Sequence, residues 1–221
     1  MHTSTLVNPE QLRLYLVTDD NLCLGRHLHE VVEAAVRGGV TCVQLREKQL
    51  ATHDFVTRAV ALKKLLAPLR IPLVINDRLD IALACEADGV HLGQSDMPVE
   101  TARRLLPAHV FMGWSVETPE DVRRAARLPV DYLGVSPVFA TPTKTDTHTP
   151  WELEGLRQVR TQTTLPLVAI GGIHDGNAAD VVQAGADGLA VVSAICSADD
   201  PKLAAEKLLS ISAPHFTKAS P

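Results

Sequence analysis

The sequence lacks paired cysteines, long apolar runs and an excess of basic residues, and each absence removes a class of function. The four cysteines, at positions 23, 42, 85 and 196, form no Cys-x-x-Cys pair, so we expect buried, reduced thiols in a cytoplasmic protein. No apolar stretch is long enough to span a membrane, and no basic region followed by an apolar stretch, typical of a secretory signal, opens the chain. A net charge of −5 excludes a general basic field for nucleic acid or anionic membrane.

What the chain of 221 residues does contain is a regular alternation of short β-rich segments and amphipathic helical segments. The predicted strands are 14–18, 41–45, 73–76, 89–92, 111–115, 132–135, 167–170 and 188–192. The predicted helices are 28–36, 55–69, 79–87, 98–106, 119–128, 151–162, 177–184 and 202–209.

Eight such units without a break in composition predict an α/β fold, a single (β/α)8 TIM barrel over residues 1–221. We expect residues 1–11 and 212–221 to be loose tails. An open doubly wound sheet is the structural alternative, although no Gly-x-Gly-x-x-Gly follows the first strand.

The end of the second predicted strand is unusually basic. Because successive side chains of a strand point to opposite faces, one face carries Gln44, Arg46 and Lys48. The other face, toward the helices, carries Val43 and Leu45. Two cations on the inner side of a barrel indicate an anion-binding site. The alternative is an ion pair at the rim, between Arg46 or Lys48 and a carboxylate such as Glu47.

Two aspartates follow the next two strands. Asp77 comes after Asn76, and Asp96 comes after the segment that contains His91. Two carboxylates on adjacent strand ends beside a basic cluster predict a Mg²⁺ site that bridges to phosphate oxygens. The alternative for either aspartate is helix capping, since each precedes a predicted helix. We interpret His91 as a structural residue that lines the barrel.

The last three strands are followed by a long loop and by glycines. Residues 136–150 are rich in hydroxyls and prolines and contain Lys144, a third positive charge, so we expect a lid or binding loop. Gly171 and Gly172 follow the seventh strand, where backbone N–H groups of such barrels hold phosphate. Together with the basic strand end, they predict two phosphorylated ligands side by side.

Six motifs, taken in order, resemble thiamine-phosphate synthases over nearly the whole chain. They are Tyr15-Leu16-Val17-Thr18-Asp19, Gln44-Leu45-Arg46-Glu47-Lys48, Ile75-Asn76-Asp77-Arg78, Gly89-Val90-His91-Leu92-Gly93-Gln94 with Asp96, Thr141-Pro142-Thr143-Lys144 and Ala169-Ile170-Gly171-Gly172-Ile173. The resemblance implies a Mg²⁺-dependent transferase that joins 4-amino-2-methyl-5-hydroxymethylpyrimidine diphosphate to a thiazole phosphate, giving thiamine phosphate and pyrophosphate.

The resemblance also implies roles for individual residues. The pyrimidine diphosphate contacts would be Gln44, Arg46, Lys48, Asn76 and Lys144, with Ser115 near the reacting centre. The Mg²⁺ ligands would be Asp77 and Asp96, and Arg46, Lys48 and Lys144 would stabilise the leaving group. The thiazole phosphate pocket would consist of Thr141, Thr143, Gly172, Val192 and Ser193.

Other functions fit parts of this pattern. A thiazole tautomerase shares the barrel and the thiazole phosphate site, but needs a base and no diphosphate cluster. A non-catalytic barrel that binds thiazole or thiamine phosphate would release no pyrophosphate. A sugar-phosphate isomerase or aldolase would leave the basic strand end unexplained. We expect small phosphorylated molecules as partners, without nucleic acid or membrane, and the oligomeric state, a homo-oligomer included, stays open.

Overall fold

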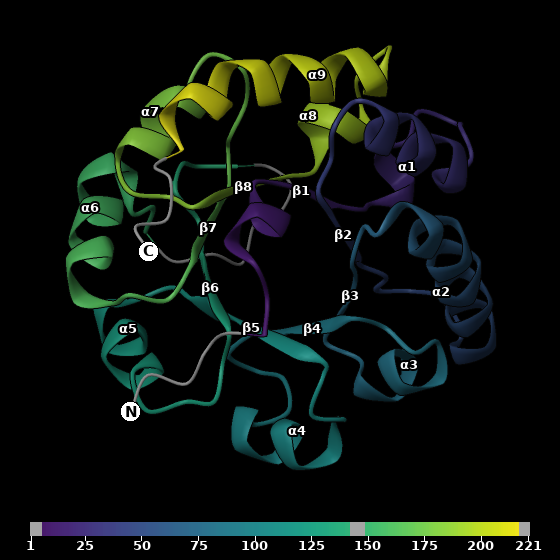
Figure 1. The fold of residues 1–221 in the computed structure, drawn as a ribbon, viewed down its shortest axis with the longest axis horizontal. Helices are drawn as coiled ribbons and strands as arrows, with labels where there is room; N and C mark the ends of the chain where they lie inside the picture. The colour runs from purple at the N-terminus through teal and green to yellow at the C-terminus, as the bar shows by residue number, and fades with distance from the viewer. Residues whose placement is uncertain (1–5, 142–148, 217–221) are drawn as a thin grey trace.

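The computed structural model describes residues 6–141 and 149–216, in which eight parallel strands close into a barrel (Figure 1). The strands are β1 (Leu14–Val17), β2 (Cys42–Leu45), β3 (Leu73–Asn76), β4 (Gly89–Leu92), β5 (Phe111–Val116), β6 (Tyr132–Val135), β7 (Leu167–Ile170) and β8 (Gly188–Val191). Each strand pairs with the next, and β8 closes the barrel on β1 with Tyr15 opposite Ala190. The predicted (β/α)8 barrel is confirmed, and the open sheet is excluded.

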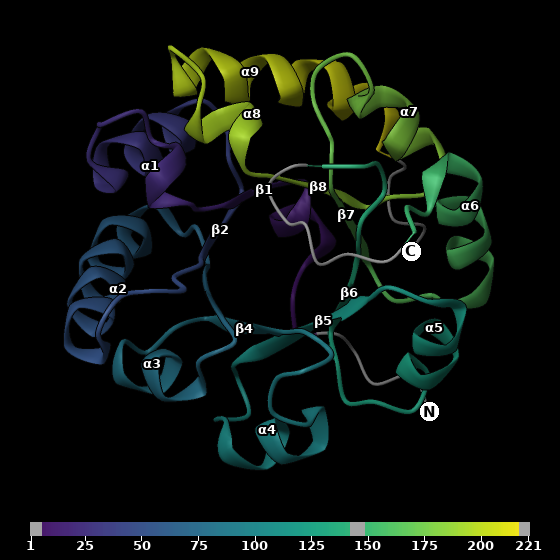
Figure 2. The same ribbon diagram turned by 180° about the vertical axis from the view of Figure 1, so that it is seen from behind.

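Helices form a ring around the barrel when it is viewed along its axis, from either end (Figures 1 and 2). They are α1 (Leu28–Arg37), α2 (Thr52–Leu66), α3 (Leu79–Ala84), α4 (Val99–Leu105), α5 (Pro119–Ala125), α6 (Glu152–Gln162), α7 (Ala178–Gln183), α8 (Ser193–Cys196) and α9 (Pro201–Ser212). Short 3₁₀ helices are η1 (Pro9–Leu12), η2 (Asp20–Leu22), η3 (Ala67–Leu69) and η4 (Ala213–His215). Within the described residues, no helix combines the length and apolarity that crossing a bilayer requires.

Several helices differ from the sequence-based expectation in their ends, and α2 and α8 show why. The helix expected at 55–69 is α2, which begins at Thr52 and ends at Leu66. Pro68 has no N–H to continue the hydrogen-bond ladder, so the chain tightens into η3. The short helix α8 was not predicted, because only Val192 separates it from β8. The apolar pattern of the strand continues to Val192 and leaves no separate signal for a helix.

The alternation along the strands produces two hydrophobic cores. Inward-facing residues, among them Tyr15, Phe111 and Tyr132, fill the barrel. Outward-facing residues, among them Val43 and Leu45, pack with the helices as expected. All four cysteines are free and buried, also as expected.

The amino-terminal segment closes one end of the barrel. Val7 and Leu12 are buried in the inner core, with exposed fractions of 1% and 0%. Gly188 at the start of β8 leaves room for this segment, because a Cβ there would lie 2.0 Å from the Leu12 carbonyl oxygen. The expectation of loose tails was therefore wrong for residues 6–11. It was also wrong for 212–216, since Ser212 is buried and η4 follows it; residues 1–5 and 217–221 lie outside the described part.

Candidate active site

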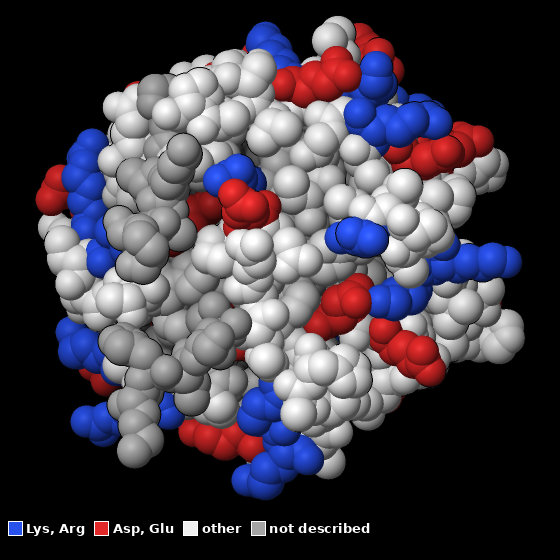
Figure 3. Space-filling view, viewed as in Figure 1, with Lys and Arg blue, Asp and Glu red and all other residues white. Residues whose placement is uncertain are grey.

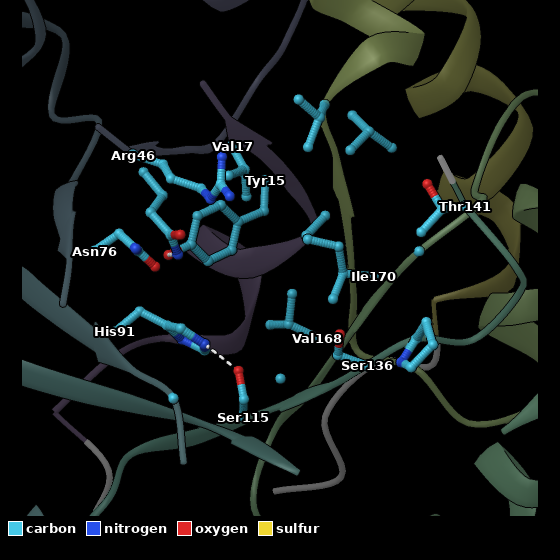
Figure 4. A pocket seen from close by; sticks show the side chains of 18 of the residues that line it. Tyr15, Val17, Arg46, Asn76, His91, Ser115, Ser136, Thr141, Val168 and Ile170 are labelled. Atoms are coloured by element: carbon cyan, nitrogen blue, oxygen red, sulfur yellow. Dashed lines mark hydrogen bonds between the residues drawn. The ribbon is translucent and has the colours of Figure 1, made fainter. Parts of the chain in front are cut away.

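A cavity of about 570 Å³ opens at the carboxyl end of the strands, the end that η1 leaves free. Inward-facing side chains of the strands form its floor, and residues that follow the strands form its walls (Figure 4). Every predicted site residue in the described part of the chain lines it: Gln44, Arg46, Lys48, Asn76, Asp77, Asp96, Ser115, Thr141, Gly172, Val192 and Ser193. Thr143 and Lys144 lie outside the described residues, so their placement stays a prediction.

The two predicted cations at the end of β2 each have a carboxylate partner. Arg46 Nη1 lies 3.5 Å from Asp19 Oδ2, and Lys48 Nζ lies 2.6 Å from Asp77 Oδ2. Ion pairs at the rim, the alternative interpretation, are therefore present, although neither pair involves Glu47. The Lys48 side chain is 53% exposed, and pairs of this kind contribute about 0–1 kcal/mol, so an incoming anion can displace the carboxylate.

Glu47 instead anchors the segment between the two cations. Its carboxylate accepts a hydrogen bond from Arg58 of α2, and the same guanidinium lies 3.0 Å from Asp20 Oδ2. Burial raises the pKa of Glu47. These contacts tie the end of β2 to α2 and to η2, and they hold Glu47 on the opposite side from Arg46 and Lys48.

The two predicted metal ligands lie together and do not cap helices. The N-caps of α3 and α4 are Arg78 and Pro98, neither with a side-chain cap bond. Asp96 Oδ2 accepts a hydrogen bond of 2.6 Å from Gly93 N, and Asp77 is held at a φ of 63° by the bond from its own N to the His91 carbonyl. The interpretation of either aspartate as a helix cap was wrong.

The chemistry of this pair fits a divalent cation. Burial raises the pKa of Asp96, and its hydrogen bond with Asp77 raises that pKa further, because two carboxyl groups in contact need a shared proton or a cation. Within the described residues no three His, Cys, Asp or Glu side chains gather into a metal site. Mg²⁺ is typically held by only one or two carboxylates, with water and substrate phosphates completing its shell, so Asp77 and Asp96 fit it.

A hydrogen-bond relay crosses the floor of the cavity. Gln44 Nε2 donates to the Tyr15 hydroxyl (3.0 Å), and the hydroxyls of Tyr15 and Tyr132 are 2.9 Å apart. The Tyr132 hydroxyl lies 2.9 Å from His91 Nδ1. His91 Nε2 lies 2.9 Å from Ser115 Oγ, the contact drawn as a dashed line in Figure 4. Burial raises the pKa values of both tyrosines well above their usual range, so both phenols keep their protons.

The sequence-based reasoning missed most of this relay. It assigned roles to its two ends, Gln44 and Ser115, but gave none to Tyr15 or Tyr132 and treated His91 as structural. One signal was available: the chain has only two tyrosines, and both fall inside predicted strands. Their pairing across 117 residues could not be derived from the pattern.

The glycine pair after β7 has a packing role of its own. Gly171 and Gly172 have φ values of 105° and 65°, which favour glycine. A Cβ on Gly172 would lie 2.8 Å from Phe139 Cβ and 2.9 Å from the Ala140 carbonyl oxygen. The pair lets β7 approach the segment after β6, and it also places Gly172 at the cavity with Val192 and Ser193 from the β8 end.

Comparison with known proteins agrees with this geometry. The family model described as thiamine monophosphate synthase matches residues 14–195. The chain belongs to the thiamine monophosphate synthase family. A thiamine-phosphate synthase of Albidiferax ferrireducens is 73% identical over 202 residues, covering 91% of this chain and 92% of the relative. One from Vibrio campbellii is 52% identical, covering 90% and 97%.

Solved structures support the same family. The thiamine phosphate pyrophosphorylase from Pyrococcus furiosus is 36% identical with a TM-score of 0.87, covering 95% of this chain and 99% of that one. A 3-hexulose-6-phosphate synthase, 19% identical with a TM-score of 0.67 over 90% of this chain and 99% of its own, shares the fold alone.

Proposed function

We propose that this chain is a Mg²⁺-dependent thiamine-phosphate synthase. It would couple 4-amino-2-methyl-5-hydroxymethylpyrimidine diphosphate with a thiazole phosphate, giving thiamine phosphate and pyrophosphate. The observation that carries the proposal is the junction of Arg46, Lys48 and the Asp77–Asp96 pair in one cavity, in a chain 73% identical to a thiamine-phosphate synthase. No isomerase of a single sugar phosphate needs this combination.

In this proposal the pyrimidine diphosphate occupies the side of the cavity formed by β2 to β5. Gln44, Asn76 and Ser115 contact the pyrimidine ring, and Arg46 and Lys48 contact the diphosphate, with Lys144 as a further cation. Asp77 and Asp96 hold Mg²⁺, which when bound neutralises charge on the diphosphate oxygens. When the diphosphate binds, Lys48 leaves its ion pair with Asp77 and contacts the diphosphate instead. The same side chain therefore has an anionic partner in both the free and the occupied site.

The reaction breaks the bond between the pyrimidine methylene carbon and the diphosphate oxygen, and the electron pair leaves with pyrophosphate. The electron-rich aminopyrimidine tolerates the methylene cation that remains. The thiazole nitrogen then donates its lone pair to the methylene carbon, with loss of CO₂ where the thiazole is carboxylated. Arg46 and Lys48 stabilise the leaving charge, and the protein needs no dedicated general base.

The thiazole phosphate occupies the side formed by the ends of β6 to β8. Thr141, Gly172, Val192 and Ser193 line this side, and Thr143 belongs to it by the family motif. This layout places the two phosphorylated groups apart and directs the thiazole nitrogen at the methylene carbon. Orientation of this kind supplies a large part of the rate enhancement in reactions between two bound substrates.

The partners in this proposal are small phosphorylated molecules of the cytoplasm, with neither nucleic acid nor a membrane involved. The net charge of −5 supports this. On the face seen in Figure 3, basic and acidic side chains are interspersed rather than gathered into one basic patch. Recognition of the anionic substrates therefore falls to the cations of the cavity.

A product assay tests the proposal directly. The purified protein is mixed with the pyrimidine diphosphate, thiazole phosphate and Mg²⁺, and thiamine phosphate and pyrophosphate are followed, with EDTA as control. We expect both products in equal amounts and none with EDTA. Asp77→Ala and Asp96→Ala should each lower kcat by orders of magnitude, whereas Asp54→Ala, at an exposed site on α2, should retain it.

Three results would contradict the proposal in different ways. Thiazole phosphate binding without product would favour a tautomerase or a non-catalytic barrel, and a test for thiazole isomerisation separates these two. Product formation in EDTA would remove the metal from the mechanism. Full activity of both aspartate variants at low Mg²⁺ would place the metal elsewhere.

A further inference from the structure

The hydrogen-bond relay from Gln44 to Ser115 is built into the barrel by glycines on neighbouring strands. A Cβ on Gly113 of β5 would lie 2.1 Å from Tyr132 Cζ, and a Cβ on Gly134 of β6 would lie 2.9 Å from His91 Cε1. The two glycines therefore provide the space in which the Tyr132 and His91 rings meet. Tyr15 and Tyr132 have exposed fractions of only 1% and 0%, so bulk water does not replace the hydrogen bonds between them.

Each hydroxyl within the relay has two relay partners and one proton. A buried phenol that accepted from both partners would leave its own O–H unsatisfied, which costs about 1–3 kcal/mol. Each tyrosine hydroxyl therefore donates to one partner and accepts from the other. The neutral imidazole of His91 behaves in the same way, since one ring nitrogen donates and the other accepts.

With the partners that the described residues supply, these constraints allow two arrangements of the protons. In the first, which follows from the contact of Gln44 Nε2 with the Tyr15 hydroxyl, the Gln44 amide donates to Tyr15, Tyr15 donates to Tyr132, and Tyr132 donates to His91 Nδ1. His91 Nε2–H then donates to Ser115, whose own O–H is left to point into the cavity. In the reverse arrangement the Ser115 O–H donates to His91 Nε2, and the side-chain oxygen of Gln44 accepts a hydrogen bond from the Tyr15 hydroxyl.

We propose that Tyr15, Tyr132 and His91 are positioning residues that couple the hydrogen-bonding character of Gln44 to that of Ser115. This inference rests on the proposed function, in which both ends contact the aminopyrimidine. An aminopyrimidine offers N–H donors on its amine and acceptors on its ring nitrogens. In the first arrangement, Gln44 keeps its oxygen for an N–H of the ring substituent, and Ser115 keeps its O–H for a ring nitrogen.

The coupling fixes which end of the relay accepts a hydrogen bond from the pyrimidine and which end donates one to it. If either end changed its character alone, a buried hydroxyl in the relay would lose its partner. The relay thus favours a pyrimidine with the matching donors and acceptors, and it holds that pyrimidine in one orientation toward the thiazole. Its three inner residues act through Gln44 and Ser115.

The tautomer of His91 is the most direct readout of the relay, and nitrogen-15 NMR of the imidazole at pH 8 measures it. We expect the wild-type protein to hold the Nε2–H tautomer. Tyr132→Phe keeps the ring and removes the hydroxyl that contacts His91 Nδ1. Without that hydroxyl, His91 Nε2 can either donate to Ser115 or accept from it, so we expect a mixture of tautomers.

Phe111→Leu is the matched control. The Phe111 ring packs on Tyr132 with centroids 6.2 Å apart, but it has no part in the relay. We expect this variant to be less stable and to keep the Nε2–H tautomer. A wild-type protein with mixed tautomers, or a Tyr132→Phe variant with the wild-type tautomer, would overturn the inference.

Kinetics provide the second readout. We expect Tyr132→Phe to lower kcat/KM for the pyrimidine diphosphate about tenfold, corresponding to about 1.4 kcal/mol, and to leave the KM of the thiazole phosphate within about twofold. In a Ser115→Ala background the same substitution should cost less than about twofold, because the end that the relay orients is already gone. Fully additive losses would contradict the coupling.

The two readouts separate this inference from the proposed function. If the wild-type protein makes thiamine phosphate but Tyr132→Phe changes neither the tautomer nor the kinetics, the relay is refuted and the function stands. If the wild-type protein makes no product, the function fails. The tautomer experiment and calorimetric titration of each variant with the pyrimidine diphosphate still decide whether the relay governs binding.

Discussion

Replacing Gly113 by alanine should destabilise the barrel strongly, although the change adds one methyl group. The new Cβ would lie 2.1 Å from Tyr132 Cζ and 2.4 Å from the Tyr132 oxygen, far closer than such atoms approach. The ring cannot move freely, because its hydroxyl is hydrogen-bonded to Tyr15 and His91 and the ring lies against that of Phe111, with centroids 6.2 Å apart and the planes tilted by 60°.

The magnitude follows from three contributions. Overpacking of a core costs about 1–3 kcal/mol, and each hydrogen bond that the displaced hydroxyl loses costs about 1 kcal/mol. The lower entropy of alanine in the unfolded chain returns about 0.4–1 kcal/mol. If the hydroxyl loses both bonds, we therefore expect Gly113→Ala to lower the free energy of unfolding by about 2–5 kcal/mol, a large share of the stability of a domain.

Urea denaturation followed by circular dichroism measures this difference. The matched control is Gly176→Ala, where the new Cβ meets only the ring of His174, whose side chain is 60% exposed. That variant should stay within about 0.5 kcal/mol of the wild-type protein. If Gly113→Ala were as stable as Gly176→Ala, the account of Gly113 as the space for Tyr132 would be wrong.

Three further predictions concern the site. Arg46→Ala should weaken the pyrimidine diphosphate far more than the thiazole phosphate, and Ser193→Ala should do the reverse; equal effects in calorimetric titrations would contradict the two-sided layout. Because the pKa of Asp96 is higher in the folded than in the unfolded protein, its ionisation opposes folding, so in EDTA the wild-type protein should lose stability relative to Asp96→Asn as the pH rises from 3 to 7. Equal stability differences at both pH values, measured by urea denaturation, would refute this. Finally, the segment 136–150, part of which lies outside the described residues, should be cut by proteases in the free protein and protected when both substrates and Mg²⁺ are bound; unchanged cleavage would argue against a closing lid.

Much of the fold could be predicted because the strands of a barrel alternate strictly between two apolar environments. The period of two located β3 and β4 to the residue, and it placed Gln44 inside the barrel and Leu45 outside. Helix ends were harder to predict, because they depend on local competition. The end of α2 at Leu66, set by Pro68, is an example.

The site could be predicted only where it follows from strand ends. Parallel strands bring their carboxyl ends to one rim, so Arg46 and Asp77 were expected to meet at the same cavity. The contact between Tyr15 and Tyr132 depends instead on how two rings pack inside the barrel. That packing is decided by Gly113, whose missing side chain leaves no periodic signal in the sequence. Likewise, the tail expected to be loose contains Val7, which is buried although the neighbouring Leu6 is exposed, and two adjacent apolar residues form no period that would reveal this.

In the free site, charged side chains pair with one another through contacts that bound ligands can replace. Lys48 lies on Asp77, Asp77 shares a hydrogen bond with Asp96, and Arg46 lies near Asp19. Each contact is weak, because Lys48 is half exposed and two carboxyl groups repel one another once both are ionised. In the proposed mechanism, a diphosphate that arrives with Mg²⁺ would satisfy both sets of charges at once, since the anion would contact the cationic side chains and the carboxylates would hold the metal. Neither component alone can do so, and we therefore expect the two to bind with positive cooperativity.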